Sequence, residues 1–447
     1  MLRLRDWLAR HAGLVVITAL ALAVRLCWNL GVHPPLDYPR SDMGMYLGRA
    51  NEMLDKPWVP QPYFTLFPFG THLLAFALKW LFGRDNSVAF SVAFAALGAL
   101  AVGYTFATAE RLSPRPSVRW LAGLTLAFYY PWISYSGYVL SETPFALALA
   151  ATAFYALRLA DRGRPRDALW LGLSLALGAV FRPQILLSAA LLGLHFLARR
   201  RVWHGFTRGH LARVAAPIVL VLAVSSARFY WHTGASLHGG QLGLISSNGP
   251  VNYVFGRCHS TVVTSDGNSA FMSPALAALG FHEKNPGASP IFPLSPVLGT
   301  NVHFVGKMWQ PAGAYALAHA CVEKSGYLTQ ARFALGHVVM LWAYNLPWPD
   351  QAQLPRFRAP MAVSAVLHSL LILPPAALAV VLSFRFRRRA ARRLLLAVHP
   401  LAMIAVAVIY FGDARFRVPY DGLLIVLAAE LLVAAVTWLR RRPFSAY

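Results

Sequence analysis

The sequence contains few charged residues and few cysteines. Only 13% of its 447 residues are charged, about half the share found in soluble globular proteins. The three cysteines, Cys27, Cys258 and Cys321, lack the spacing of a zinc site. Cys258 and Cys321 fall in one long polar stretch, where they either form a disulfide in an oxidising compartment or stay as free thiols. The sequence alone leaves both alternatives open.

Several nucleotide-binding and hydrolytic motifs are also missing from the sequence. It has no P-loop, no dinucleotide fingerprint and no GxSxG nucleophile elbow, which argues against an ATPase, a Rossmann oxidoreductase and an α/β-hydrolase. No two histidines have the close helical spacing of a strong metal site. No metal ligands are therefore assigned, although a bound divalent ion stays open.

Long apolar runs dominate what is present. Hydrophobic residues make up 57% of the chain, and several runs reach the roughly 18 to 20 residues that span a bilayer. The run over residues 13–31 is followed by His33-Pro34-Pro35 instead of a small-residue cleavage site, so we expect a retained helix. The sequence predicts an all-α polytopic membrane protein with about ten spanning helices, within a range of ten to twelve.

The net charge of +24 is distributed in a way that indicates membrane topology. Arginine clusters flank the apolar runs, as at residues 3–10, 199–201, 385–393 and 440–442. This is the positive-inside pattern, and it argues against a nucleic-acid partner. It places the N- and C-termini in the cytoplasm.

The same rule identifies two apolar runs that should not cross. Between Gly31 outside and Arg111 inside, the number of crossings must be odd, yet residues 64–82 and 88–108 are both apolar. The first run is the more amphipathic, so we expect it to lie at the outer surface or to re-enter without spanning. The alternative is that the charge rule fails at one loop. We expect a second surface helix over residues 331–346. The expected organisation is an N-terminal transmembrane module (1–230), an outer loop region (231–358) and C-terminal transmembrane helices (359–447).

Two acids on the predicted outer side are candidate catalytic residues. Charged groups beside a membrane span are costly, which makes them functional candidates. Asp42 precedes a predicted surface helix, and Glu142 opens a spanning helix. Both positions are also ordinary helix starts, where acids favour the N-terminus, so capping is the alternative role for each.

The outer side also carries arginines and a tyrosine that could bind substrate. Arginine binds phosphate in forked geometry, although an arginine at a helix mouth is equally an interfacial anchor. The candidates are Arg25, Tyr46, Arg182, Arg415 and Arg417.

The order of these features resembles the GT-C superfamily of membrane glycosyltransferases. It is most similar to the dolichyl-phosphate-mannose–protein mannosyltransferase-like enzymes and their bacterial aminoarabinose-transferase relatives. Two departures are that Met43, not glutamate, follows Asp42, and that Phe416, not tyrosine, separates the C-terminal arginines. The resemblance rests on Arg25 in the first helix, Asp42 with Tyr46 four residues on, Tyr135-x5-Ser141-Glu142, Arg182-Pro183 and Arg415-Phe416-Arg417.

The resemblance implies a transferase in a bacterial inner membrane. Such an enzyme moves a sugar from a polyprenyl-phosphate donor to a hydroxyl of a lipid, an envelope glycan or a protein, on the outer face and with inversion. It implies Asp42 as the catalytic residue, with Glu142 as the second acid, and no cofactor beyond the divalent ion already left open. The competing hypotheses are a lipid-linked-sugar flippase or other transporter, and a non-catalytic membrane scaffold.

Overall fold

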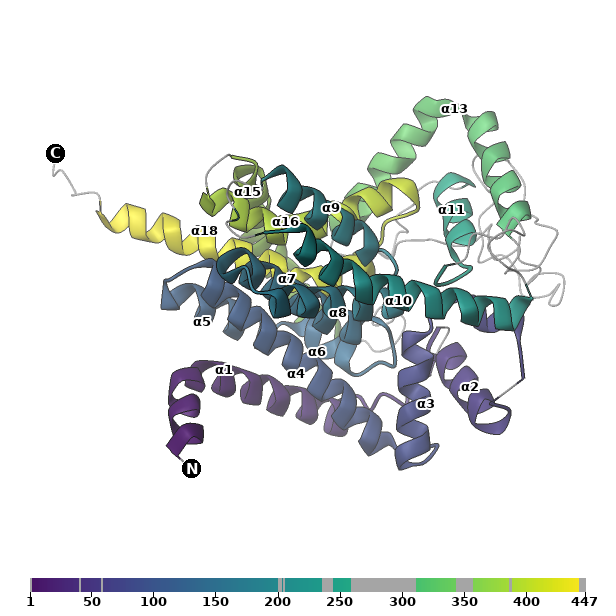
Figure 1. Ribbon diagram of the computed structural model, residues 1–447, viewed down its shortest axis with the longest axis horizontal. Helices are drawn as coiled ribbons and strands as arrows, with labels where there is room; N and C mark the ends of the chain where they lie inside the picture. Colours follow the sequence, from purple (N-terminus) through teal and green to yellow (C-terminus); the bar gives the residue numbers. More distant parts are fainter. Residues whose placement is uncertain are drawn as a thin grey trace.

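A computed structural model describes residues 2–39, 42–57, 59–199, 203, 206–234, 244–258, 311–342, 357–385 and 388–441. Every regular element in these ranges is helical, as predicted. The long helices run side by side along one direction, with α7 (Glu142–Arg162) among them near the centre (Figure 1).

Seven of the described helical segments are long and apolar enough to cross a membrane. They are α1 (Leu2–Cys27) with the π-helix Trp28–Val32, α4 (Ser87–Leu112), α7, α10 (Arg208–Thr233), α14 (Arg358–Leu367) continuing through the π-helix His368–Ile372 into α15 (Leu373–Ser383), α16 (Arg388–Ile409), and α17 (Ala414–Arg417) continuing through the 3₁₀ helix Val418–Tyr420 into α18 (Asp421–Arg441). The chain is therefore a multi-pass membrane protein.

The predicted count of about ten spans is not confirmed. The remaining predicted spans are shorter helices: α5 (Pro116–Ala127) with α6 (Tyr130–Ser136), α8 (Pro165–Phe181), and α9 (Ile185–Ala198). The chain between α5 and α6 is interrupted at Phe128 and Tyr129, because Pro131 lacks the N–H that would continue the helix.

Both runs that the charge pattern excluded from spanning form helices outside the seven long spans. Residues 64–82 form part of the 3₁₀ helix Pro62–Thr65 and then α3 (Gly70–Phe82), which has only 13 residues. The run that begins at Ala331 is the second part of α13 (Pro311–Trp342), which kinks at Gly326. Residues 343–346 of the second run lie outside the described residues, and within the described ones neither run is among the seven long spans.

The outer loop region carries helices of its own. A disulfide joins Cys258, the last residue of α11 (Gly249–Cys258), to Cys321 in α13, with 5.2 Å between their Cα atoms. Of the two alternatives that the sequence left open for these cysteines, a disulfide or free thiols, the structure has the disulfide. From α11, Arg257 donates hydrogen bonds to the carbonyls of Val408, at 2.6 Å, and Ile409 at the end of α16. The disulfide-linked pair is therefore fastened to the segment that leads into α17.

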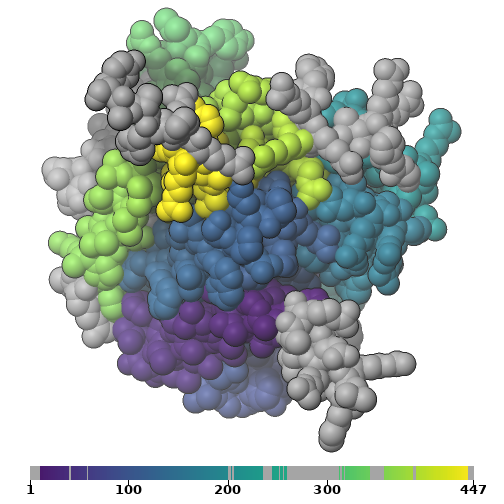
Figure 2. Space-filling model, turned by 90° about the vertical axis from the view of Figure 1, so that its left-hand side faces the viewer, coloured from purple at the N-terminus to yellow at the C-terminus, as the bar shows by residue number. Residues whose placement is uncertain are grey.

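The described helices that begin and end the chain reach the same end of the molecule. Figure 1 shows both termini there, and α2 (Asp42–Asp55), α3 and α11 near the opposite end. Figure 2 looks onto the end with the termini, where α1, in purple, and α18, in yellow, flank the blue segment around α5. The predicted outer helices thus lie away from the predicted cytoplasmic termini.

Candidate active site

Asp42 and Glu142 meet at one guanidinium, although 100 positions separate them in the sequence. Arg415 donates from Nη2 to Oδ2 of Asp42 at 3.1 Å and from Nε to Oε1 of Glu142. The three residues come from the first turns of α2, α7 and α17. The fold therefore joins the two predicted acids through a predicted substrate-binding arginine.

Arg182 completes this group from the break between α8 and α9. Its Nη2 donates to Oε1 of Glu142 at 2.5 Å, and its Nε donates to Oγ of Ser141 at 3.0 Å. A helix break between Phe181 and Ile185 directs this arginine inward, since Pro183 cannot continue the helix. We call Asp42, Glu142, Arg182 and Arg415 the acid–guanidinium cluster.

The members of the cluster differ in exposure. The side chain of Asp42 is 24% exposed, that of Arg415 14%, that of Arg182 8% and that of Glu142 1%. In their ionised forms, two carboxylates balance two guanidiniums, which is how buried charges are tolerated. Asp42 thus lies at the accessible edge of the cluster, and Glu142 anchors both arginines at its base.

Tyr46 lies one helical turn beyond Asp42 on the same side of α2. It is 4% exposed, and its ring packs against Phe67 at 5.4 Å between centroids. Burial, together with the negative charge of Asp42, raises the pKa of Tyr46. The phenol therefore stays protonated at neutral pH beside the cluster, as a substrate-binding hydroxyl would be.

Arg417 was expected to share the substrate-binding role of Arg415, and the structure separates the two. Side chains two residues apart in a helix do not share a face. Arg417 is 1% exposed and makes an ion pair with Asp421 at 3.0 Å, besides donating to the carbonyl of Leu341 at 3.2 Å. These contacts fasten α17 to α18 and α13.

Arg25 also lies apart from the cluster, contrary to its expected grouping with the other arginines. It is fully buried and donates to the carbonyls of Leu126 and Ala127 at 3.4 and 3.3 Å. These carbonyls end α5, where the last turn of a helix lacks intrahelical partners. The position of Arg25 explains how the break before α6 is tolerated within the bundle.

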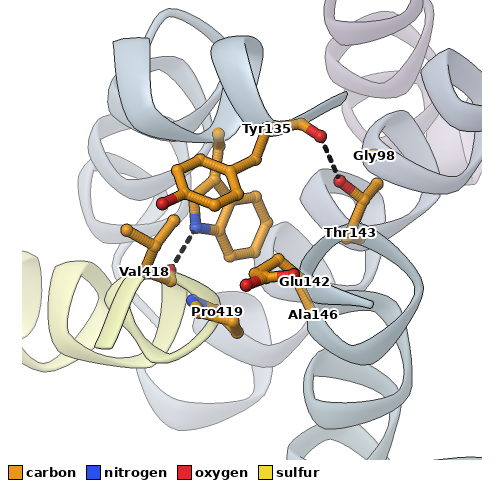
Figure 3. A pocket seen from close by; sticks show the side chains of 9 residues that line it. Gly98, Tyr135, Glu142, Thr143, Ala146, Val418 and Pro419 are labelled. Carbon is orange, nitrogen blue, oxygen red and sulfur yellow. Dashed lines mark hydrogen bonds between the residues drawn. The ribbon is translucent and has the colours of Figure 1, made fainter. Parts of the chain in front are cut away.

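A small cavity borders Glu142 on the side facing α4 and α6. In Figure 3, Glu142 lies below Tyr135. The indole N–H of Trp132 donates to the carbonyl of Val418 at 2.7 Å. Thr143 donates to the carbonyl of Tyr135 at 3.0 Å. The sequence did not predict a role for Ser141 or Trp132, although Ser141 belongs to the motif Tyr135-x5-Ser141-Glu142 and Trp132 precedes it by three residues. The cavity is lined by Gly98, Ala101, Trp132, Tyr135, Glu142, Thr143, Ala146, Val418 and Pro419.

The arrangement of the cluster does not resemble a metal site. Within the described ranges, no three His, Cys, Asp or Glu side chains converge. The carboxylates of Asp42 and Glu142 would be the natural oxygen ligands for a divalent cation, but the guanidinium of Arg415 bridges them. Three histidines of the outer loop region, His238, His259 and His303, lie outside the described residues.

Comparison with known proteins supports the fold. Residues 61–231 match the family described as dolichyl-phosphate-mannose-protein mannosyltransferase, which is less than half of the chain. No curated protein matches the sequence.

Three solved structures are similar in arrangement. The Archaeoglobus fulgidus oligosaccharyltransferase AglB, in complex with an inhibitory peptide and a dolichol-phosphate, is 15% identical, with a TM-score of 0.50 over 97% of this chain and 51% of AglB. The apo form of the Archaeoglobus fulgidus oligosaccharyltransferase is 14% identical, with a TM-score of 0.51 over 95% of this chain and 51% of that chain. ArnT from Cupriavidus metallidurans, bound to undecaprenyl phosphate, is 16% identical, with a TM-score of 0.39 over 96% of this chain and 79% of ArnT.

The predicted resemblance to GT-C membrane glycosyltransferases is confirmed by the family match and the shared fold. This chain spans about half the length of the archaeal oligosaccharyltransferase.

Proposed function

We propose that the chain is a glycosyltransferase that moves a sugar from a polyprenyl-phosphate-linked donor to an acceptor hydroxyl on the outer face of the membrane. One observation carries the proposal: the fold brings Asp42 and Glu142 together around Arg415 at helix N-termini. The mannosyltransferase match over residues 61–231 supports the reaction class. The GT-C fold, shared with an oligosaccharyltransferase solved with a dolichol-phosphate, supports the lipid-linked donor.

Asp42 is the proposed general base. It is the more exposed of the two carboxylates, so an acceptor hydroxyl can approach it. As the acceptor oxygen bonds to the anomeric carbon, Asp42 takes the hydroxyl proton, and the bond from that carbon to the phosphate oxygen breaks with its electron pair leaving on the polyprenyl phosphate. A single displacement of this kind inverts the anomeric centre.

The remaining cluster residues position the base and the substrates. Glu142 holds Arg415 and Arg182, and these guanidiniums supply the positive charge that faces Asp42 and the reacting groups. Tyr46 offers a protonated phenol beside Asp42. In this proposal Arg25 and Arg417 act through the helices that they join, while the cluster contacts the reacting groups.

The wider proposal concerns placement in the cell. The arginine clusters favour cytoplasmic termini in a bacterial inner membrane, with α2 and the cluster on the opposite, outer side. Residues 1–230 would form the catalytic module, residues 231–358 the outer region and residues 359–447 the C-terminal membrane helices. The last part supplies Arg415, so the site draws on both membrane parts of the chain.

Transfer from a labelled polyprenyl-phosphate sugar tests the proposal. Asp42→Asn keeps the size of the side chain and removes the base, and we expect at least a hundredfold lower transfer. The matched control is Asp55→Asn at the other end of α2, where Asp55 is exposed and paired with Arg84. Near-normal transfer by Asp42→Asn would exclude the base assignment. Movement of the lipid-linked sugar across vesicles without any transfer would instead favour a flippase.

A further inference from the structure

A second group of basic side chains lies next to the acid–guanidinium cluster. Arg49 in α2, His72 in α3 and Arg228 in α10 converge around the 3₁₀ helix Pro62–Thr65. Arg228, Arg49 and His232 all interact electrostatically with His72, and Arg49 does so with Arg228. We call these three residues the basic cluster.

Arg49 is the most unusual member of the basic cluster. Its side chain is 2% exposed, and within the described part of the chain none of its three guanidinium nitrogens has a hydrogen-bond partner. The guanidinium lies over the rings of Phe67 and Tyr63, at 5.0 and 5.7 Å from their centroids. Stacking on two rings leaves the in-plane N–H groups of Arg49 free to donate to a ligand.

The other two members add donors to the same region. Arg228 donates to the carbonyls of Phe64 and Ile245, both at 2.9 Å, while its buried Nε lacks a partner among the described residues. Nδ1 of His72, which is 3% exposed, likewise lacks one there. Three helices therefore point unsatisfied nitrogen groups into one buried region.

A buried guanidinium without partners is costly, because isolated charges are strongly disfavoured away from water. Burial lowers the pKa of Arg49 to about 10, so the group remains charged at neutral pH. Glu52 and Asp42 attract Arg49 from a distance, yet no described carboxylate forms an ion pair with it. The surroundings of Arg49 thus favour an anion with several acceptor oxygens.

We propose that Arg49, with Arg228 and His72, binds the phosphate group of a phosphate ester. Phosphate matches the forked donors of arginine. Asp42 and Arg49 are seven residues apart and lie on one side of α2, which is about 10 Å along a helix that rises about 1.5 Å per residue. That separation leaves room for one sugar residue between the proposed base and the phosphate. The identification of this phosphate with that of the sugar donor rests on the proposed function.

Direct binding to the purified full-length protein tests this inference. The probes are farnesyl phosphate, inorganic phosphate and phosphatidylglycerol, measured by calorimetry in neutral detergent. Arg49→Gln should weaken binding of at least one phosphate ester tenfold or more, since a hydrogen bond to a charged group is lost. The matched control is Arg84→Gln, which removes an exposed arginine that pairs with Asp55 at the end of α2 and should change binding less than twofold.

The results separate the sources of the phosphate. Arg49-dependent binding of farnesyl phosphate indicates an isoprenoid ester, and Arg49-dependent binding of phosphatidylglycerol alone indicates a membrane phospholipid. Unchanged binding in Arg49→Gln, or equal weakening in Arg84→Gln, would overturn the inference. If Arg49→Gln does not fold, the wild-type thermal midpoint decides: farnesyl phosphate should raise it and farnesol should not.

This binding experiment is independent of sugar transfer. Asp42→Asn should keep Arg49-dependent phosphate binding while transfer is lost. Intact binding with no transfer in the wild type would count against the proposed enzyme and leave the phosphate site standing. If transfer depends on Asp42 but phosphate binding does not depend on Arg49, the result would support the proposed enzyme and overturn the phosphate site.

Discussion

Arg182 and Arg415 donate to the same oxygen atom, Oε1 of Glu142, from positions 233 residues apart in the sequence. One buried carboxylate therefore holds two guanidiniums that belong to different parts of the membrane bundle. This relationship makes Glu142 the structural centre of the cluster, and it leads to the first prediction.

Replacing Glu142 with glutamine should destabilise the protein as well as reduce transfer. The change leaves Arg182 without its counter-charge and leaves Arg415 with Asp42 alone, and breaking a buried pair costs on the order of 3 kcal/mol. Thermal unfolding in detergent measures the loss. Glu110→Gln serves as the control, because Glu110 pairs with Arg119 at the surface and such pairs contribute less than about 1 kcal/mol. Equal stability of the two variants would contradict the anchoring role.

Gly98→Ala should destabilise the bundle near Arg25. A methyl group at Gly98 would lie 2.8 Å from Nε and 2.9 Å from Cδ of Arg25, and Arg25 is held by the carbonyls that end α5. Overpacking of this kind costs about 1 to 3 kcal/mol. Gly193→Ala in α9 is the control, because it meets nothing within 4 Å and should be neutral or slightly stabilising. A stable Gly98→Ala variant would show that Arg25 can move freely.

Stability should fall as the pH drops below about 6.5, in part through His72. Burial, with Arg228 and Arg49 nearby, lowers the pKa of His72 well below 6.5. The unfolded chain therefore binds a proton in this range that the folded chain does not, which costs up to about 1.4 kcal/mol per pH unit.

Unfolding midpoints at pH 7.5 and 5.5 measure this effect. His72→Phe should show a smaller difference between the two pH values than the wild type. His319→Gln is the control, because it removes an exposed histidine from the outer loop region. If His72→Phe keeps the full pH dependence, other groups are responsible.

Reduction of the Cys258–Cys321 disulfide should lower transfer. The bond ties α11 to α13, and Arg257 beside it fastens α11 to the end of α16, just before the segment that carries Arg415. Loss of such a constraint costs about 2 to 4 kcal/mol. We expect Cys258→Ser to transfer more slowly and to be insensitive to reductant. Cys27→Ser, which removes the free cysteine, should behave as the wild type does, and a fully active Cys258→Ser would refute the positioning role.

Charge parity and helix-start motifs were sufficient to place the cluster on one side. Asp42, Glu142, Arg182 and Arg415 each stand at the end of an apolar run, so the positive-inside rule assigns them a common face. Their mutual ion pairs depend on how α2, α7 and α17 pack. Single-sequence patterns do not contain that information.

The same patterns could not distinguish arginines that face the cluster from those that do not. Arg417 follows Arg415 by two residues, and only the helical geometry of α17 turns it toward Asp421. Arg25 produces the same signal as Arg182, an arginine near the end of an apolar run, but it meets the broken end of α5. The sequence did not predict a binding role for Arg49, whose only distinguishing feature is its place seven residues after Asp42 in an amphipathic helix.

The position of Arg415 has a consequence for biosynthesis. Asp42 and Glu142 are made and inserted early, while the guanidinium that bridges them is encoded 273 residues after Glu142. The ribosome must therefore translate most of the chain before the two acids can be bridged. Under the proposed function, a nascent chain that has only its N-terminal helices in the membrane holds an incomplete site and cannot transfer sugar.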